Sequence, residues 1–537
     1  MNRQTYLLHP LLFAVMPVLS IAGNNPGQYR WSDFFTVVAS VLVIVAVILV
    51  VVLLTLQLRQ PPDRAGQSAA LVVTLAVAWC FYYPPLQQLF VELTWVPAHR
   101  LVALSLGVLV SAAALLLTRR PAALPTVNRT LTVAAALLVG MGVLQLAANQ
   151  ARTVRTVRAS RLVRLTSAPV PIATLPPGRK GPKRDIYLVV LDNRANSTVM
   201  REVLDFDDTA FEDSLRALGF VIPRDMQSNY THTLHSVTSL LNFEHVTQLT
   251  EDAGPRNPDF SIEAHLVAHN RAARFLKAQG YRYVFFPSAW WSLTADSPIA
   301  DEEFRAVPGV DLPYSLWRTQ LRYWVIRSSL LRNVAWLQAD RVTDPRHYLR
   351  TFEGLKQVPA DTAPTFAFAH LLITHGPFLL DSTCAPSARP VLRITENNSP
   401  RTRAAYLQQL RCADRLVLDL VTTVLRRSPT PPIIIVVGDH GSRFSDPHFF
   451  ARPQRASVAL TRERFGAFGA FYLPAGGDSL FKERVTLVNV LRNVFRYYFG
   501  AELPPVPNQQ FVTGWKSYKF YPRDTLGSAT AAVRVAR

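Results

Sequence analysis

The chain has 537 residues, a formal net charge of +20 and a hydrophobic fraction of 49%. This apolar content excludes an intrinsically disordered chain, and the count of only three cysteines excludes a disulfide-rich scaffold. Long apolar runs in the first 150 residues exclude a wholly soluble protein, whereas the rest of the chain alternates like a soluble α/β protein.

Five apolar segments near the N-terminus are candidates for membrane-spanning helices. A helix of about 20 apolar residues crosses a hydrocarbon layer of about 30 Å. Three of the segments are long and free of charged residues, one contains two prolines, and one runs into a Pro-Pro pair. Two points stay open: whether the first is a cleaved signal peptide, and whether the third crosses fully. The predicted α-helical transmembrane bundle of about five spans, within residues 1–150, comprises residues 7–22, 34–58, 69–83, 101–118 and 130–148.

The arginines between these spans predict an orientation, because short loops rich in Lys and Arg stay in the cytoplasm. One set of alternate loops has only Arg30 and Arg100. The opposite set therefore faces the cytoplasm, and the C-terminal two-thirds of the chain is extracytoplasmic, even if the first span is cleaved. We expect a multi-pass protein of the bacterial cytoplasmic (inner) membrane with its large domain on the periplasmic side. The inside arginines are Arg3, Arg59, Arg64, Arg119, Arg120 and Arg129.

Residues 151–182 are predicted to connect the anchor to a soluble domain over residues 183–537. Five arginines at three-residue spacing favour one helical stripe along anionic headgroups, with a solvated helix face as the alternative. Prolines then make a stiff linker. Cys384 and Cys412 are the soluble domain's only cysteines, so one disulfide is possible. The arginines are Arg152, Arg155, Arg158, Arg161 and Arg164, and the prolines are Pro169, Pro171, Pro176, Pro177 and Pro182.

Three apolar runs of the soluble domain predict buried parallel strands with polar ends. Residues 185–192, 365–375 and 431–440 end in Asp192, in His375 and in the pair Asp439-His440. Ligands of open α/β sheets lie at the carboxyl ends of strands. Carboxylates and imidazoles that converge there predict a site for one divalent metal ion, Zn or Mn, although a single acid at a strand end is commonly a cap or turn residue.

A hydroxyl-rich stretch, residues 228–242, changes to helical apolar spacing from Leu234. A hydroxyl at a helix N-terminus can serve as its cap. The same position directs the helix dipole and backbone N–H groups at an anion such as phosphate, and coordination to a dication would lower the pKa of the hydroxyl. The stretch is therefore either a capping motif or the source of a nucleophile.

Several motifs of the chain follow one another in an order that resembles a known family. They are Asp185-Ile-Tyr-Leu-Val-Val-Leu-Asp192, residues 228–242 with Thr233, Ser236 and Asn242, Gly280-Tyr-Arg-Tyr283, Trp290-Trp291, Phe368-Ala-His370, His375-Gly-Pro-Phe378, Gly438-Asp-His-Gly-Ser-Arg443 and Phe471-Tyr-Leu-Pro474. They resemble the sulfatase-like branch of the alkaline phosphatase superfamily, and within it the membrane-anchored lipoteichoic acid synthase and phosphoethanolamine transferase group. The resemblance covers most of residues 183–499 and the anchor. It implies an α/β alkaline-phosphatase-like domain with a mainly parallel central sheet flanked by helices.

The resemblance also implies roles for individual residues. Asp192 matches the first metal-binding acid, Asp439 and His440 match the second metal-binding pair, and Thr233 matches the metal-bound nucleophile. His375 resembles the histidine that contacts the transferred group or protonates the leaving oxygen. An alternative register favours Thr231 as the nucleophile, so the choice between the two threonines stays open.

Arg443, His235 and Asn242 are further candidates for substrate binding. The alternative to substrate binding is an ordinary structural role, such as a surface ion pair or a solvent-facing position. His370 is interpreted as a structural strand histidine on the basis of alternation. Asn193 stands where related sequences often have glycine. This departure and others leave the proposed metal ligands intact and put the substrate in doubt.

One motif resembles the active-site signature of true sulfatases. Cys384-Ala-Pro-Ser-Ala-Arg389 resembles the Cys-x-Pro-x-Arg signature that sulfatases convert to formylglycine, but its arginine is one residue late and it follows the wrong strand. We interpret it as a loop. A hydroxyl nucleophile is therefore favoured over a formylglycine.

Together these features predict a metal-dependent transferase with a phosphothreonine intermediate. It would move phosphoethanolamine or phosphoglycerol from a membrane phospholipid to an envelope glycan or lipid. One alternative is a phosphodiesterase or sulfatase-like hydrolase that uses water, and another is a non-catalytic membrane scaffold of the same fold. The net charge alone suggests nucleic acid, but no motif supports such a partner.

Overall fold

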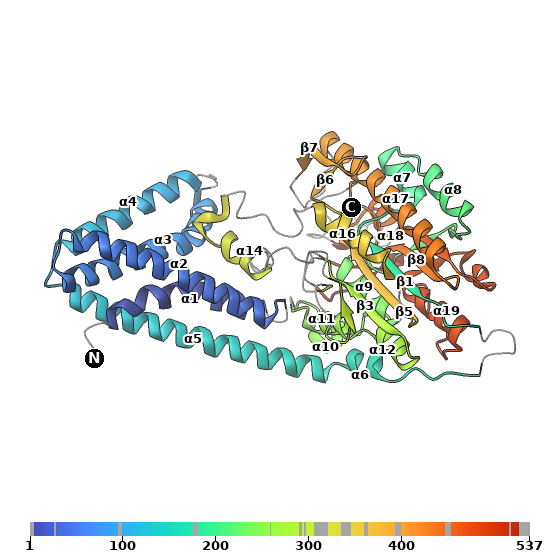
Figure 1. The fold of residues 1–537 in the computed structure, drawn as a ribbon, viewed down its shortest axis with the longest axis horizontal. Coiled ribbons are helices and arrows are strands. Elements are labelled where there is room, and N and C mark those ends of the chain that lie inside the picture. Colours follow the sequence, from blue (N-terminus) through green and yellow to red (C-terminus); the bar gives the residue numbers. More distant parts are fainter. Residues whose placement is uncertain are drawn as a thin grey trace, which may run out of the picture. The chain divides into compact units, whose positions relative to one another are not determined.

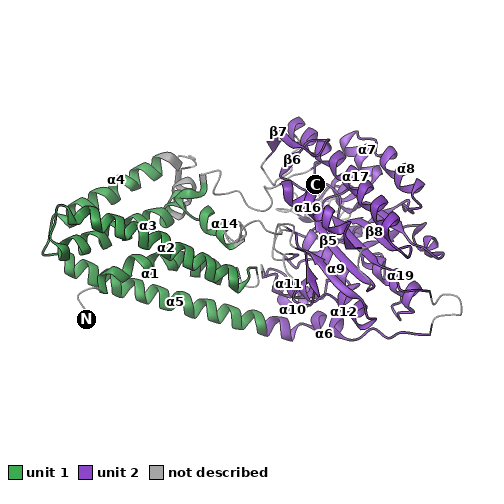
Figure 2. Ribbon diagram, viewed as in Figure 1, with its two compact units in different colours: residues 1–154, 309–340 green, residues 155–308, 341–537 purple. Residues whose placement is uncertain are grey.

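The computed structural model describes residues 5–25, 28–94, 99–174, 181–257, 259–288, 293–294, 297–304, 320–333, 345–358, 363–391, 399–445, 453–514 and 517–525. The predicted motif Trp290-Trp291 and the linker prolines Pro176 and Pro177 lie outside these residues. The chain forms two compact units, coloured separately in Figure 2. Unit 1 comprises residues 1–154 and 309–340, and unit 2 comprises residues 155–308 and 341–537.

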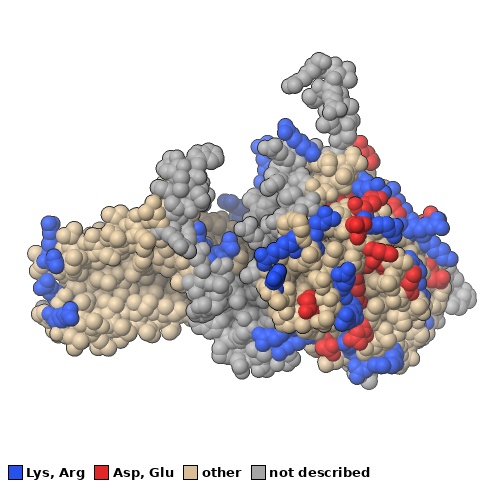
Figure 3. Space-filling model, turned by 90° about the horizontal axis from the view of Figure 1, so that it is seen from above, with Lys and Arg blue, Asp and Glu red and all other residues tan. Residues whose placement is uncertain are grey.

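Unit 1 contains the predicted bundle of apolar helices (Figure 1). Among the described residues, five helices are long and apolar enough to cross a membrane: Thr5–Gly23, Trp31–Gln57, Pro62–Tyr83, Leu101–Thr118 and Leu124–Ala159. Large apolar side chains cover their outer faces, for example Val43, Leu104 and Leu144, which are 62%, 68% and 70% exposed. The visible surface of unit 1 in Figure 3 accordingly carries few charges over most of its length. The helices are α1 (Leu8–Gly23), α2 (Trp31–Gln57), α3 (Pro62–Thr94), α4 (His99–Thr118) and α5 (Leu124–Ala159), preceded by η1 (Thr5–Leu7).

A second segment of unit 1 comes from the middle of the chain. The helix α14 (Gln320–Arg327) and the 3-10 helix η2 (Leu330–Asn333) pack on α1, α2 and α3. The sequence-based division assigned all of residues 183–537 to the soluble domain, and the structure differs from it here. Leu321 and Val325 explain the difference, because they are buried among apolar residues of α1 and α2.

The predicted single arginine stripe is divided between two helices. The helix α5 ends at Ala159, and α6 (Arg161–Ser167) begins after Ser160. The Ser160 hydroxyl accepts a hydrogen bond from the Val163 N–H and donates one to Asp252 at 2.6 Å, so a capping serine breaks the helix. Arg161 pairs with Glu251 on the surface. The expectation of one continuous stripe is therefore wrong.

Unit 2 is built on a six-stranded sheet with the strand order β4-β3-β5-β1-β8-β9. All neighbouring strands are parallel except β8 and β9, which are antiparallel, so the predicted mainly parallel sheet is confirmed. The strands are β4 (Glu302–Glu303), β3 (Arg282–Phe286), β5 (Thr365–Leu371), β1 (Ile186–Leu191), β8 (Ile433–Gly438) and β9 (Gly469–Tyr472).

Helices cover both faces of this sheet, as the alternation of β1 requires. Ile186, Leu188 and Val190 point to one apolar cluster, and Tyr187, Val189 and Leu191 point to the other. The first face is covered by α9 (Thr233–Asn242), α11 (Ser261–Ala268), α12 (Arg271–Ala278) and α19 (Leu487–Phe499). The second is covered by α8 (Thr209–Ala217), α16 (Pro345–Leu355) and α17 (Pro400–Arg427).

Shorter elements complete unit 2. The helices α7 (Ser197–Leu204), α10 (Leu249–Ala253) and α18 (Val458–Phe465) lie between the larger ones. Three two-stranded sheets pair β2 (Met226–Gln227) with β10 (Val485–Thr486), β6 (Phe378–Leu380) with β7 (Pro386–Val391), and β11 (Phe511–Val512) with β12 (Tyr521–Pro522). The 3-10 helices are η5 (Leu372–Thr374), η7 (Pro453–Arg455), η8 (Gly477–Phe481) and η9 (Arg523–Thr525).

The possible disulfide between Cys384 and Cys412 is formed. It joins the turn between β6 and β7 to α17. Cys384 is therefore a structural cysteine, in agreement with the interpretation of residues 384–389 as a loop.

Candidate metal centre and active site

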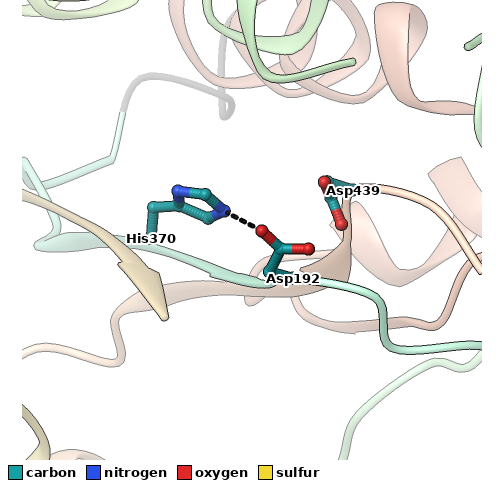
Figure 4. Close-up of side chains that lie close together, drawn as sticks. All are labelled: Asp192, His370 and Asp439. Carbon is teal, nitrogen blue, oxygen red and sulfur yellow. Dashed lines mark ion pairs between the residues drawn. The ribbon is translucent and has the colours of Figure 1, made fainter. Parts of the chain in front are cut away.

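The site is assembled at the carboxyl ends of the three central strands. Val190 of β1 pairs with His370 of β5, and Leu191 pairs with Gly438 of β8. Asp192 and Asp439 are the next residues, so the register sets these two carboxylates side by side. By the period of two along a strand, His370, Asp192 and Asp439 all point to the sheet face that α9 covers. Figure 4 shows the three side chains together.

These three residues form a buried group whose geometry suits a cation. One candidate ligand atom from each lies within 4.8 Å of the others. His370 Nε2 is 3.4 Å from Asp192 Oδ2. Within the described part of the chain, neither carboxylate oxygen of Asp192 has a hydrogen-bond partner, and the same is true of Asp439 Oδ2 and His370 Nε2. Buried carboxylate oxygens and an imidazole nitrogen without hydrogen-bond partners match the ligand preferences of Zn or Mn.

The pKa values of Asp192 and Asp439 also favour a cation site. Burial alone would raise the pKa of Asp192, but the charges of His375 and His370 hold it well below its usual range. Burial, together with the charge of Asp192, raises the pKa of Asp439 to about 7. Two buried carboxylates this close repel each other when both are ionised. A bound dication would remove that conflict and keep both as ligands.

Thr233 lies beside this group at the first residue of α9. Its Oγ1 is 2.9 Å from His440 Nε2, and the same nitrogen is 3.1 Å from Asp439 Oδ2. The other ring nitrogen of His440, Nδ1, contacts the carbonyl oxygen of Gly441 at 3.1 Å, which turns Nε2 toward the site. Burial, and then the charge of Arg464, lowers the pKa of His440 well below its usual value, which favours the neutral imidazole that metal ions bind. Thr233, Asp439 and His440 thus come together as predicted from the motifs.

In the structure, a residue other than Thr233 caps the N-terminus of α9. The N-cap of α9 is His232, whose Nδ1 accepts a hydrogen bond from the Leu234 N–H at 3.3 Å. The Thr231 hydroxyl accepts a hydrogen bond from the Thr513 N–H at 3.2 Å. Of the two threonines left open by the sequence, Thr233 is the one whose hydroxyl reaches the metal-ligand candidates.

His375 lies at the edge of the site. It follows η5 directly, its Nδ1 is 2.7 Å from the carbonyl oxygen of Gly376, and it is close enough to Asp192 for its charge to lower the pKa of that acid. Arg443 lies near His232, whose pKa is lowered mainly by burial and to a smaller extent by the charges of His235, Arg464 and Arg443. Both positions suit contact with an anionic substrate at the rim.

Two predicted substrate-binding residues are not brought to the site. Asn242 is the last residue of α9, about 14 Å along the helix from Thr233. Its side-chain NH₂ donates to the carbonyl oxygens of Thr238 and Leu266, and its Oδ1 accepts from the Arg271 N–H. His235 forms a buried pair with Glu263 at 2.6 Å. Both side chains are used in holding α9 against its neighbours.

Sequence reasoning missed two residues of the site, His370 and Arg464. His370 was interpreted as structural, yet the register places it on the same face as Asp192. Thr294 Oγ1 lies 2.9 Å from its Nδ1 and orients Nε2 toward Asp192. The five-residue spacing to His375 was visible in the sequence, but only the pairing of β5 with β1 tells which face His370 occupies.

Arg464 is the second missed residue, and no motif marks it. The residue is 2% exposed, and its guanidinium donates to the carbonyl oxygens of Thr231 and Gly441 and to Oδ1 of Asn193. Asn193 has φ 69°, a left-handed backbone conformation. Glycine adopts this conformation without steric cost, and Asn tolerates it better than most other residues do. Its N–H donates to Asp439 Oδ1 at 2.9 Å.

Several solved structures are similar to this chain at low sequence identity, whereas no curated protein matches it. The C-terminal periplasmic domain of EptC from Escherichia coli in complex with Zn has 12% identity, a TM-score of 0.44, and coverage of 67% of this chain and 97% of that one. The lipooligosaccharide phosphoethanolamine transferase EptA from Neisseria meningitidis has 12% identity, a TM-score of 0.41, and coverage of 94% and 96%. For the lipoteichoic acid synthase LtaP from Listeria monocytogenes the values are 11%, 0.40, 68% and 88%.

The family comparison covers the part of the sequence that holds most of the site. Residues 220–478 match the family model described as Sulfatase. This range includes Thr233, His370, His375, Asp439 and His440, and Asp192 lies just before it. The family model therefore confirms the sulfatase-like resemblance inferred from the motifs over residues 220–478, and apolar helices long enough to cross a membrane precede this range.

Proposed function

We propose that this protein transfers a phosphoryl-linked headgroup, phosphoethanolamine or phosphoglycerol, from a membrane phospholipid to a glycan or lipid of the cell envelope. The observation that carries the proposal is the Thr233 hydroxyl 2.9 Å from His440 Nε2, beside buried carboxylate oxygens that lack a hydrogen-bond partner among the described residues. A hydroxyl at a helix N-terminus next to a cation site is suited to attack an anionic phosphodiester.

The residues that would hold one divalent cation, Zn or Mn, are Asp192, Asp439, His440 and Thr233, with His370 as an additional ligand. When bound, the ion would lower the pKa of a coordinated hydroxyl and neutralise charge that develops on the phosphoryl oxygens. The oxygen and nitrogen donors fit both metals. Arg443 and His375 at the rim would contact the anionic substrate.

The first displacement forms a bond between Thr233 Oγ1 and phosphorus and breaks the bond from phosphorus to the diacylglycerol oxygen. The leaving oxygen takes up a proton from Nε2 of His375, because the Nδ1 of that residue is engaged with Gly376. Thr233 gives its proton to solvent before this attack. In the second displacement an acceptor hydroxyl attacks the phosphorus of the phosphothreonine and gives its proton to Nε2 of His375. The Thr233 oxygen leaves as the alkoxide, so both residues are ready for the next cycle.

The proposed location is the cytoplasmic (inner) membrane, with unit 2 on the periplasmic side. Five helices suited to cross a membrane and the arginines of their alternate loops support this orientation. The disulfide between Cys384 and Cys412 supports an oxidising compartment. Phospholipid headgroups are abundant beside such a domain, and the anchor would raise their effective concentration.

The test is mass spectrometry of the peptide that contains Thr233, from protein purified from its host membrane and quenched in acid. We expect an added phosphoethanolamine or phosphoglycerol on Thr233, which would identify both nucleophile and donor. Thr233→Ala should abolish the adduct and divalent-dependent headgroup transfer. Thr231→Val, the matched control, should keep both, because the Thr231 hydroxyl is used by Thr513.

Product analysis distinguishes the acceptors. Transfer to an envelope glycan or lipid supports the proposal, whereas release of the free headgroup phosphate alone would replace it with a hydrolase. Full divalent-dependent activity in Thr233→Ala would show that the nucleophile is assigned incorrectly. A purified chain that carries no stoichiometric divalent ion would favour a scaffold.

A further inference from the structure

His232, the residue directly before Thr233, has a ring nitrogen that helix capping does not account for. The residue is 5% exposed and forms the N-cap of α9. Capping requires one acceptor, and Ser, Thr, Asp and Asn commonly supply it from a short side chain. An imidazole supplies that acceptor from one nitrogen and presents a second nitrogen on another side of the ring. The second nitrogen belongs to the neighbour of the proposed nucleophile, so contact with substrate is the role to examine.

The hydrogen bond of the cap determines which nitrogen of His232 carries the proton. Nδ1 accepts from the Leu234 N–H at 3.3 Å. An accepting ring nitrogen carries no proton, so the ring is neutral and its proton is on Nε2. Because Nδ1 faces the first turn of α9, Nε2 and its proton face away from that turn. His232 is therefore a hydrogen-bond donor directed beyond the N-terminus of the helix.

Neighbouring side chains hold the His232 ring and its backbone in place. The ring of His235 has its centroid 5.6 Å from that of His232, and His235 is itself fixed by the 2.6 Å contact of its Nδ1 with Glu263. Arg464 donates to the carbonyl oxygen of Thr231, in the peptide group that leads into His232. A donor held in this way loses little conformational freedom when it binds a ligand.

The transferred group would lie at the same end of the helix. Thr233 begins α9, and its Oγ1 is 2.9 Å from His440 Nε2, so a phosphoryl group bonded to that oxygen lies at the helix N-terminus. Asp192 and Arg443 are close enough to His232 for their charges to act on its ring. The Asp192 carboxylate oxygens have no hydrogen-bond partner among the described residues, which independently indicates a ligand at this place.

We propose that Nε2–H of His232 donates a hydrogen bond to a non-bridging oxygen of the phosphoryl group that becomes bonded to Thr233. This role makes His232 a catalytic residue, and it rests on the proposed function. Negative charge is spread over the non-bridging oxygens in the transition state of phosphoryl transfer. A donor that is already held in position stabilises this charge without reorganisation. His232 keeps its proton throughout, so it changes the balance of bonds and protons in neither displacement.

The first experiment removes the donor and keeps the cap, in full-length protein reconstituted in nanodiscs. In His232→Asn the side-chain oxygen still accepts from the Leu234 N–H, because Asn is a preferred N-cap residue, but the Nε2 donor is lost. We expect the melting temperature and divalent-ion affinity of the parent. The kcat for headgroup transfer from phosphatidylglycerol or phosphatidylethanolamine should fall about 100-fold. A parent-like kcat in His232→Asn would overturn the proposal.

A second pair of variants decides the outcome if His232→Asn is unstable. His232→Gln and His232→Met both lack the short capping side chain and are similar in size, so any loss of stability from the cap is shared. Only Gln carries an N–H donor near the position of Nε2. We expect His232→Gln to transfer the headgroup about 10-fold faster than His232→Met. Equal kcat values in these two variants would refute a donor role.

Phosphate binding provides a measurement that does not depend on turnover. Calorimetric titration of the zinc-loaded full chain with inorganic phosphate should show about 10-fold weaker binding in His232→Asn than in the parent. His269→Asn, at the partly exposed C-cap of α11, is the matched control and should bind phosphate like the parent. Equal phosphate affinities of His232→Asn and the parent would contradict the proposed contact.

Thr233→Ala distinguishes a failure of this proposal from a failure of the proposed function. It should lose the covalent adduct and the transfer, yet its phosphate affinity should still fall when His232→Asn is added. Phosphate binding that depends on His232, in a chain that transfers no headgroup, would refute the transferase and support the contact. Headgroup transfer in the parent, with kcat and phosphate affinity both unchanged in His232→Asn, would support the transferase and refute the contact.

Discussion

Nη1 of Arg464 lies 2.9 Å from Oδ1 of Asn193, and the same buried guanidinium donates to the carbonyl oxygens of Thr231 and Gly441. One cation thereby joins the end of β1, the loop before Thr233 and the loop after His440. We predict that Arg464→Met removes these hydrogen bonds, lowers the free energy of unfolding by at least about 3 kcal/mol and weakens metal binding.

Arg464→Lys keeps the charge and should recover part of the metal affinity. Calorimetric metal titration and thermal unfolding in detergent measure both effects. An Arg464→Met protein with the metal affinity and melting temperature of the parent would contradict a positioning role for Arg464.

His370 provides the second prediction, because its Nε2 faces Asp192 without a hydrogen-bond partner in the described part of the chain. We expect His370→Ala to weaken binding of the divalent ion by about 10- to 100-fold. His269→Ala, on a partly exposed histidine that stacks on His265 in unit 2, is the matched control and should bind metal like the parent.

The same metal should stabilise the fold. A chelator is expected to lower the melting temperature of the parent protein, since a ligand that binds only the folded state stabilises it. The decrease should be smaller in His370→Ala. Identical metal titrations of His370→Ala and the parent would show that His370 is not a ligand.

The third prediction concerns acid stability. Burial, followed by the charge of His269, lowers the pKa of His265 to about 4 in the folded protein, below the ordinary value of 6.5. The unfolded chain therefore binds this proton more readily, and the stabilising contribution is complete above pH 6.5 and lost as the pH falls toward 4. His265→Gln should flatten the fall of the melting temperature across this window. An unchanged slope would contradict the prediction.

The fourth prediction concerns the disulfide. Cys384 and Cys412 are separated by 28 residues, and closing a loop of this size in the unfolded chain contributes about 3–4 kcal/mol of stability in the chain-entropy model. Reduction, or replacement of both cysteines by Ala, should lower the melting temperature of unit 2. Cys80→Ser, at the free cysteine, should have little effect. Equal melting temperatures before and after reduction would exclude a stabilising role.

Local features of the chain were sufficient for the large elements of the fold. Apolar runs such as 34–58 are long enough to predict membrane-spanning helices, and the continuous apolar strand before Asp192 predicts burial on both faces. Strand ends in Asp192 and in Asp439-His440 also predicted a metal site, because the carboxyl ends of neighbouring parallel strands meet at one edge. These inferences depend on length and periodicity, which a sequence records directly.

The remaining features depend on which segments meet in space. His370 joins Asp192 and Asp439 because the register of β5 against β1 selects its face, and a shift of one residue would turn it away. Asn242 and His235 were candidates for substrate binding, but their partners on α11 and α12 engage them in packing. Residues 320–333 pack on α1 and α2 through two buried side chains, which no local pattern distinguishes from an ordinary helix of unit 2. Length, periodicity and motifs were enough to predict the elements and a metal site at the strand ends. Register and long-range packing arise only on folding, and they select which side chains face the site.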